Sequence, residues 1–369
     1  MSQILYFASE RFEFLSRELG WSFHPRDHLK YELKTDFLFP QKTCVLLIGN
    51  DAGELEYLED LPVNSVWVYL YADETYFPAL NLNLLRTKAV RGIIRAYPTR
   101  QARFRSLILN FIKSLLISLS KSSIQDSLSL ILQVPKGLIY LFRKTLVSGL
   151  QRLEGKESIS LMPGYTNLFA EAYCNKYSEF LNSTSSLLKF SEHKSIESNS
   201  KPLLINFVGQ KGKWWRQYAL SQARNYFSFE EAKLETRVGF GGTLGSNGAS
   251  SESAREYLDA MDDSYFTLCP PGNYSYGSFR ILEALICQSI PVYAPIHSWD
   301  ALFKPPWLDR DWKAVHQSWG DVFISIKRFR KNEFEKTIES QIASARQYLA
   351  EVNSVLLGNM SVLYLNRDK

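Results

Sequence analysis

Three side chains with complementary chemistry occur close together near residue 280: Ser278, Arg280 and Glu283. They follow an apolar segment and a glycine-containing loop, so the pattern predicts a strand, a loop and a helix that begins near Ser278. A helix N-terminus presents unpaired N–H groups and a positive dipole end, which suit a phosphate. Arg280 adds a two-pronged donor for phosphate oxygens, and Glu283, one turn further on, can accept from ribose hydroxyls. This spacing favours a nucleotide-diphosphate site.

The same residues also fit a simpler interpretation. Strand–loop–helix units occur in any α/β protein, and Arg280 with Glu283 would then form a surface ion pair worth about 0.3–0.5 kcal/mol. A single local motif leaves both interpretations open.

The bulk composition predicts a folded protein of two domains. The chain has 369 residues, of which 45% are apolar and 22% charged, and this length suffices for two cores. Its four cysteines are widely spaced, with no Cys-x-x-Cys pair, which favours a reducing compartment. No basic segment followed by a long apolar run occurs at the N-terminus, so we expect a cytoplasmic protein, at most attached to the inner face of a membrane.

Strands alternate with helical segments in the first part of the chain, which predicts a Rossmann-like layer. Short helices are expected at 54–61 and 80–85. The expected strands are 3–8, 43–49, 66–71, 92–95 and 159–162.

Segment 101–153 interrupts this alternation with two long amphipathic patterns and is predicted to be a helical insertion. Residues 99–156 hold ten Lys/Arg and two acidic residues, a net charge of +8 in a chain whose total is +5. One interpretation is a helical hairpin that packs on the domain with a basic exposed side. The other is contact with an anionic membrane, where each basic residue contributes about 1 kcal/mol. Nucleic acid is not expected as a partner, because the basic residues alternate with Leu and Ile rather than with aromatic residues.

A second strand-first unit follows a Ser/Asn-rich linker. Helices are expected at 169–180, 214–226, 253–262 and 333–357, with strands at 203–209, 266–268 and 290–294. The predicted organisation is therefore an N-terminal domain at 1–181, a linker at 182–201, a second domain at 202–332 and a C-terminal helix at 333–369.

Four motifs occur in order in the second half. They are Phe207-Val-Gly209 followed by Arg216, Phe266-Thr-Leu-Cys-Pro-Pro-Gly272, Ser278-Phe-Arg280-Ile-Leu-Glu283 and Ile290-Pro-Val292. In this combination, residues 203–330 resemble the exostosin-like glycosyltransferases. Weaker similarity to the same family lies in the first half, at Tyr71-Ala-Asp73-Glu74, Ile94-Arg95-Ala-Tyr97 and Met162-Pro-Gly164-Tyr165.

The resemblance implies a GT-B architecture, in which two Rossmann-like domains face a cleft and the second holds a nucleotide-sugar donor, commonly a UDP-sugar. By position it implies that Gly209 and Arg216 lie near the donor phosphates, that Ser278 and Arg280 hold the diphosphate, and that Glu283 holds the ribose or sugar. The intervening loop supplies the other expected donor-binding residues: Gly272, Asn273, Tyr274 and Gly277.

Three features depart from the family. Gln288 stands where a glycine normally precedes the Ile-Pro-Val strand, so an altered turn is expected there. The family is mostly secretory and membrane-anchored, whereas no anchor is expected here, and insertion 101–153 has no counterpart in it. Substrate and compartment therefore stay open.

Transfer of a glycosyl group needs stabilisation of the leaving diphosphate and a base for the acceptor hydroxyl. No Asp-x-Asp motif occurs, Asp262 and Asp263 are expected to cap or solvate a turn, and a metal-independent enzyme without a cofactor is the expectation. Asp73 and Glu74 follow strand 66–71, at the edge where open α/β sheets bind ligands. Either could be the base, or one caps a helix while the other is solvated.

The predicted function is transfer of a sugar from a nucleotide-sugar to a glycan or lipid-linked glycan acceptor, with inversion, in surface polysaccharide synthesis. The alternatives are a non-catalytic protein that binds glycans or nucleotide-sugars, and a nucleotide-sugar epimerase. The sugar, the acceptor and the oligomeric state are open at this level.

Overall fold

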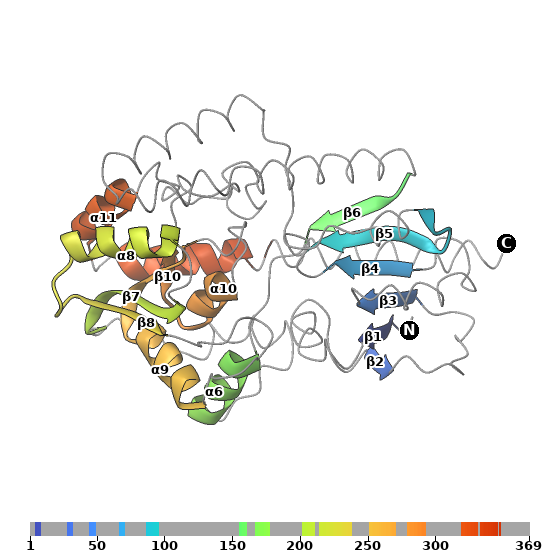
Figure 1. The fold of residues 1–369 in the computed structure, drawn as a ribbon, viewed down its shortest axis with the longest axis horizontal. Coiled ribbons are helices and arrows are strands. Elements are labelled where there is room, and N and C mark those ends of the chain that lie inside the picture. The colour runs from blue at the N-terminus through green and yellow to red at the C-terminus, as the bar shows by residue number, and fades with distance from the viewer. Residues whose placement is uncertain are drawn as a thin grey trace.

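Two parallel sheets form the framework of the computed structural model (Figure 1). The structure describes residues 4–8, 28–31, 44–48, 66–70, 86–95, 155–160, 167–177, 201–210, 214–237, 251–270, 279–292, 319–330, 333–345 and 347. The expected helices at 54–61, 80–85 and 101–153 lie outside these residues, as does linker 182–201 except for its last residue.

The first sheet has six strands in the order β2-β1-β3-β4-β5-β6, and every recorded pairing is parallel. The strands are β1 (Ile4–Ala8), β2 (His28–Tyr31), β3 (Cys44–Ile48), β4 (Val66–Leu70), β5 (Val90–Arg95) and β6 (Glu157–Ser160). At its edge, Arg91 on β5 donates to the Glu157 carboxylate on β6 across 2.9 Å.

The second sheet has four parallel strands in the order β10-β9-β7-β8. They are β7 (Leu203–Gln210), β8 (Ala232–Arg237), β9 (Ser264–Leu268) and β10 (Ile290–Val292). A buried polar chain crosses it: Asn206 donates to the Thr267 hydroxyl (2.8 Å), which lies 2.7 Å from the Ser289 hydroxyl. A shift of one strand by one residue would turn its side chains to the other face of the sheet and break these hydrogen bonds. The buried polar groups therefore favour the observed strand register.

Both sheets share the order of a doubly wound fold, in which the second strand lies on one side of the first and the third on the other. The direction of winding therefore reverses between β1 and β3, and again between β7 and β9. Ligands of open α/β sheets bind outside the carboxyl ends of the strands at such switch points. The expected α/β class with parallel sheets is confirmed.

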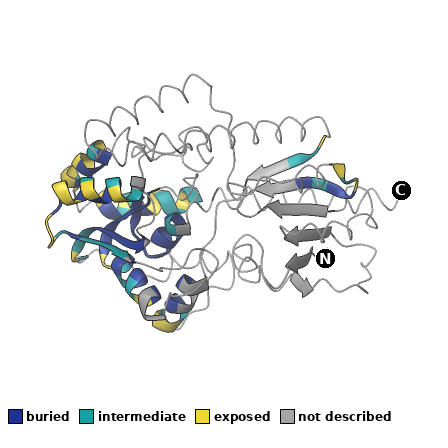
Figure 2. Ribbon diagram, viewed as in Figure 1, coloured by how far each residue is buried: buried dark blue, intermediate teal, exposed yellow. Residues whose placement is uncertain are grey.

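Helices cover both faces of the second sheet. Right-handed crossovers place α8 (Trp214–Tyr226) on one face, and α9 (Ser251–Asp262) and α10 (Phe279–Ile286) on the other (Figure 1). The strands β9 and β10 are wholly buried, while the outward sides of α8 and α11 (Trp319–Arg328) are exposed (Figure 2). The core of this unit therefore lies between the sheet and its helices.

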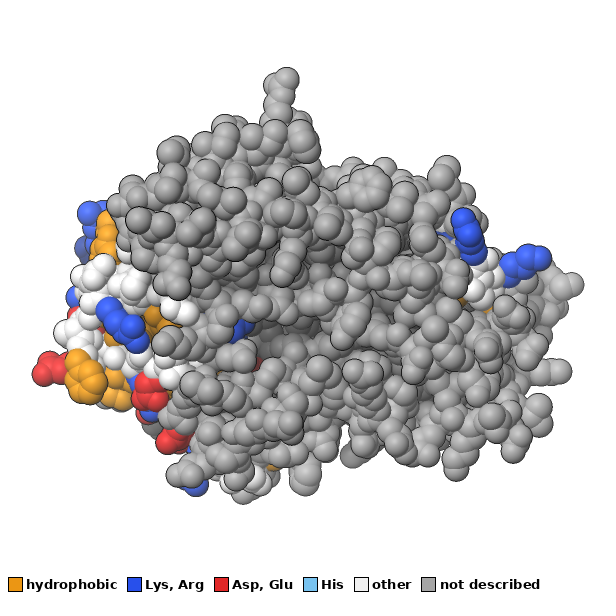
Figure 3. Space-filling view, viewed as in Figure 1, with side chains coloured by type: hydrophobic (Ala, Val, Ile, Leu, Met, Phe, Trp, Pro, Cys, Tyr) orange, Lys and Arg blue, Asp and Glu red, His pale blue; other side chains and the backbone are white. Residues whose placement is uncertain are grey.

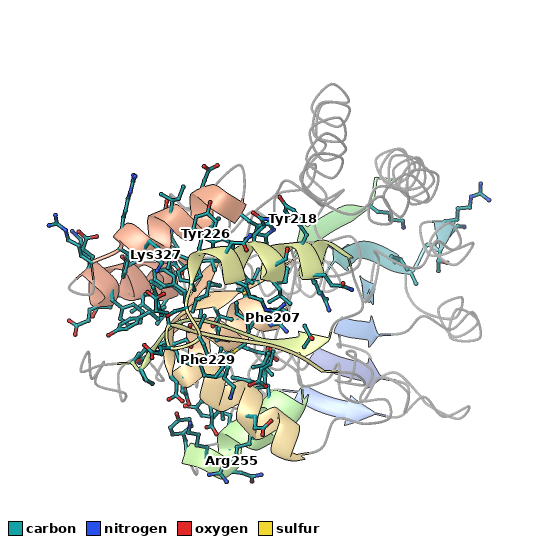
Figure 4. All side chains as sticks on the ribbon, turned by 60° about the vertical axis from the view of Figure 1, so that its left-hand side comes forward. Phe207, Tyr218, Tyr226, Phe229, Arg255 and Lys327 are labelled. Carbon is teal, nitrogen blue, oxygen red and sulfur yellow. The ribbon has the colours of Figure 1, made fainter. Side chains whose placement is uncertain are left out.

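Aromatic side chains join α11 to α8. The Phe323 ring lies 5.6 Å from that of Tyr226 and 5.5 Å from that of Phe227. Lys327 adds bonds of 2.9 Å to both Glu231 oxygens at the surface. Figure 4 shows Lys327 and Tyr226 on these two helices, with Phe229 in the turn that follows α8. On the described surface of this unit, basic and acidic side chains are interspersed (Figure 3).

Polar contacts attach α6 (Asn167–Tyr177) to α9. Lys176 bonds the carboxylates of Asp259 (2.6 Å) and Asp262 (2.8 Å), and the Tyr177 hydroxyl donates to Asp262. The expectation that Asp262 caps or solvates a turn is wrong, because its side chain is buried in this inter-helix contact. Asp263, by contrast, is exposed.

The turn after α10 has the geometry that a glycine would give. Gln288 has a φ of 50°. Its N–H donates to the Leu285 carbonyl oxygen, and the N–H of Ser289 donates to the Ala284 carbonyl oxygen. This is the Schellman arrangement, with a left-handed residue just beyond the helix. Gln288 therefore adopts the left-handed conformation that a glycine would take at this position without strain.

Residues 334–345, which lie within the helix expected at 333–357, are helical. Its Phe334 packs edge-on against Tyr265 of β9, with ring centroids 4.9 Å apart. No helix among the described residues is long and apolar enough to span a bilayer.

Candidate ligand site at the switch point of the second sheet

Arg280, the second residue of α10, extends its side chain to the carboxyl end of β7. Its Nη2 donates to the Val208 carbonyl oxygen across 3.0 Å, and its guanidinium lies 4.3 Å from the centroid of the Phe207 ring. A cation over an aromatic face is attracted to the ring electrons. The structure thus fixes a permanent positive charge at the β7/β9 switch point, in the first turn of a helix.

Gly209 provides the space for this side chain. A Cβ at position 209 would overlap Arg280 Nη2 and lie 3.2 Å from Phe207 Cζ. Only a residue without a side chain leaves the guanidinium where it is. The resemblance implied a place for Gly209 near the donor phosphates, and the structure adds this second reason for a glycine.

Tyr257, on α9, connects Arg280 to Glu283. Arg280 Nε donates to the Tyr257 hydroxyl across 3.3 Å, and that hydroxyl donates to Glu283 Oε2 across 2.6 Å. Burial, and then the nearby Glu283 charge, raise the pKa of Tyr257 well above its usual value of 10. The hydroxyl therefore keeps its proton at neutral pH and acts as donor to the carboxylate.

Glu283 is only 2% exposed, so the alternative of a surface ion pair between Arg280 and Glu283 is wrong. An ionised carboxylate inside a protein is costly unless it accepts hydrogen bonds or faces a positive charge. Here Tyr257 supplies such a bond. Sequence reasoning identified Arg280 and Glu283 but missed Tyr257.

Cys269, just after β9, is a fully buried neighbour of this cluster. Burial raises the pKa of its thiol to about 12, against the opposing influence of Arg280. Its Sγ donates to the Thr267 carbonyl oxygen across 3.4 Å. The thiol is thus protonated at neutral pH and is no candidate nucleophile.

Arg216 lies in the first turn of α8, the helix that follows β7, and is half-buried. That helix begins four residues after the end of β7, so its N-terminus faces the same carboxyl edge as Arg280. The topology therefore brings Arg216, Gly209, Arg280 and Glu283 to one edge of the sheet. The other expected site residues lie outside the described residues: Asp73, Glu74, Gly272, Asn273, Tyr274, Gly277 and Ser278.

Arg280 and the start of α10 can hold an anion, since Arg280 supplies charge-assisted donors and the helix start supplies backbone N–H groups and a dipole. The Glu283 carboxylate would repel an anion and can only accept hydrogen bonds, for example from hydroxyl groups. Within the described ranges, no cluster of three or more His, Cys, Asp or Glu residues could hold a metal ion.

The described residues define an α/β protein with two sheets of doubly wound order and a fixed arginine at the switch point of the second. No family model and no curated protein sequence matches the chain. Among solved structures, the crystal structure of an alpha1,3-fucosyltransferase is similar at 12% identity and a TM-score of 0.41, over 95% of this chain and 91% of that one. Likeness at that level does not establish a shared family.

Proposed function

We propose that the protein is a glycosyltransferase that binds the diphosphate of a nucleotide-sugar donor at the β7/β9 switch point. The observation that carries the proposal is the placement of Arg280. Its guanidinium is held by Val208 and Tyr257 at the carboxyl edge of the sheet, in the first turn of α10. A pre-positioned cation beside a helix N-terminus stabilises the charge that accumulates on a leaving diphosphate.

In the proposed reaction, an acceptor hydroxyl oxygen attacks the anomeric carbon of the sugar while the bond from that carbon to the phosphate oxygen breaks. The nucleoside diphosphate leaves with the bonding electron pair, next to Arg280. The hydroxyl proton passes to a carboxylate, for which Asp73 or Glu74 is the candidate. Both follow β4 in the sequence, three and four residues after its last residue, Leu70.

The finer identity rests on the motifs at 203–330. They support an exostosin-like enzyme of GT-B architecture that uses a UDP-sugar, needs no metal and acts with inversion on a glycan or lipid-linked glycan. Contact of insertion 101–153 with an anionic membrane, from the cytoplasmic side, is part of the same proposal and would suit a lipid-linked acceptor.

Calorimetric titration of UDP and GDP into wild-type protein tests the diphosphate site, with the monophosphate CMP as the nucleotide that should not bind. We expect one nucleotide to bind and Arg280→Ala to weaken it by roughly tenfold or more, since a hydrogen bond to a charged group contributes about 1.5–3 kcal/mol. Arg255→Ala is the matched control, because Arg255 lies on α9 with its side chain 73% exposed (Figure 4). Equal affinity in wild type and Arg280→Ala would refute the assigned site.

A turnover assay then separates the possible activities. A transferase releases nucleoside diphosphate only with an acceptor, an epimerase converts the donor without one, and a binding protein does neither.

A further inference from the structure

We infer that Tyr257 is a positioning residue of the donor site, which orients Arg280 and Glu283 together. The inference rests on the proposed function, because it assigns Tyr257 a role in holding the groups that contact the donor. The Tyr257 hydroxyl is hydrogen-bonded to both residues at once.

The two groups that Tyr257 connects have opposite charge and lie three residues apart on α10. Side chains at this spacing are neighbours on a helix surface, and opposite charges there attract each other. The Tyr257 hydroxyl accepts from Arg280 Nε and donates to Glu283 Oε2. Each ionic group is thereby held by a hydrogen bond to Tyr257 on α9. These two bonds fix the orientation of the Arg280 and Glu283 side chains relative to each other.

Contacts from three elements converge on the guanidinium. Val208 and Phe207 hold it from β7, Tyr257 holds it from α9, and α10 carries it. The Tyr257 ring also lies 5.5 Å from the guanidinium. A side chain constrained in this way loses little further freedom when an anion binds, which favours affinity.

Tyr257 is itself held firmly, which a positioning role requires. Its side chain is buried, and α9 packs against both β7 and β9. The raised pKa of the hydroxyl keeps its proton in place, so the bond to Glu283 is present throughout the neutral range.

The test is Tyr257→Phe, which removes only the hydroxyl and keeps the buried ring. With UDP and GDP as probes in calorimetry, we expect the affinity for the nucleotide that wild type binds to fall roughly tenfold, the cost of one hydrogen bond to a charged group. Tyr265→Phe is the matched control. It removes a hydroxyl from another buried tyrosine, which packs on Phe334 at the N-terminal end of β9, away from the carboxyl ends of the strands. Tyr265→Phe should therefore leave nucleotide affinity unchanged.

A double-mutant cycle separates positioning from general support of the fold. If Tyr257 acts through Glu283, Tyr257→Phe should cost clearly less affinity in an Glu283→Gln background than in wild type. A merely structural hydroxyl would lower the melting temperature of both backgrounds alike and give additive losses. Should Glu283→Gln fail to fold, the same cycle is run with Arg280→Lys.

The role of Tyr257 and the proposed function would be overturned by different outcomes. Nucleotide binding by wild type with unchanged affinity in Tyr257→Phe, or additive losses in the cycle, would overturn the role of Tyr257 alone. No binding of either nucleotide by wild type would overturn the proposed function, and this inference with it.

Discussion

Arg280 occupies the space that a side chain at position 209 would need. The Gly209→Ala methyl group would overlap Nη2, which is the far end of a flexible side chain, so Arg280 can move away. The stability cost should therefore stay within about 1.5–3 kcal/mol, the typical contribution of a hydrogen bond to a charged group such as the lost bond to Val208. Nucleotide affinity, by contrast, should fall roughly tenfold as the guanidinium leaves its position.

Calorimetry measures the change in nucleotide affinity of Gly209→Ala, and thermal melting measures its change in stability, in the same samples. The internal control is Gly209→Ala in an Arg280→Ala background, where the extra methyl meets nothing at Nη2 and should change affinity little. A full additional loss in that background would show that Gly209 acts independently of Arg280.

The turn after α10 predicts a stabilising substitution. Gln288 adopts a left-handed conformation with φ 50°, which costs a residue with a Cβ about 1–2 kcal/mol. Gln288→Gly removes that strain, partly offset by glycine's greater unfolded-state entropy, so we expect its unfolding free energy to exceed that of Gln288→Ala by about 1 kcal/mol. Urea denaturation measures it. Gln288→Ala is the reference, because it loses the same buried side-chain contacts as the Gly variant but keeps the Cβ; a Gly variant no more stable than the Ala variant would refute the explanation.

The α6–α9 contact predicts weakening at alkaline pH. Burial, and then the bond to Asp262, raise the pKa of Tyr177 above its usual 10. For Lys176, burial acts to lower the pKa, but the bonds to Asp259 and Asp262 outweigh it and raise the pKa above 10.5. Both groups bind their protons more tightly when folded, so their stabilisation is complete below about pH 10 and is lost as pH rises further.

Denaturation of wild type and Tyr177→Phe between pH 8 and pH 11 checks this. The variant should lose stability less steeply above pH 10, because one of the two groups is gone. Identical slopes would show that Tyr177 does not titrate differently in the folded and unfolded states.

If Asp73 or Glu74 is the catalytic base, its substitution should lower turnover without changing donor affinity. Asp73→Asn or Glu74→Gln should lower kcat by about 10²–10⁴, the usual contribution of general base catalysis. Donor affinity should stay the same, because both residues follow a strand of the other sheet. Initial rates at saturating donor and acceptor measure the effect, and full activity of both variants would exclude both as the base.

Much of the second unit was predictable because its central elements carry strong patterns. The apolar run at 203–209 and the amphipathic helix at 214–226 gave β7 and α8 nearly residue for residue. The motif around Arg280 gave β9, α10 and β10 in order. Strands buried on both faces are mostly apolar along their length, and this makes them visible in a sequence.

The strands that sequence reasoning missed or misplaced lie at sheet edges. β2 and β8 were not predicted, and β6 lies two residues before its expected position. An edge strand has one neighbour and tolerates charged side chains, as Lys233 and Glu235 show in β8. Tyr257 was missed for a different reason: it lies 26 residues before Glu283, and only the packing of α9 against the sheet brings their side chains together.

The position of a bound nucleotide tests the central claim most directly. A crystal structure of the protein with UDP or GDP, whichever binds in calorimetry, should place the diphosphate at the carboxyl ends of β7 and β9, with a phosphate oxygen about 3 Å from the Arg280 guanidinium. A diphosphate bound elsewhere on the chain, with Arg280 still directed only at Val208 and Tyr257, would contradict the account.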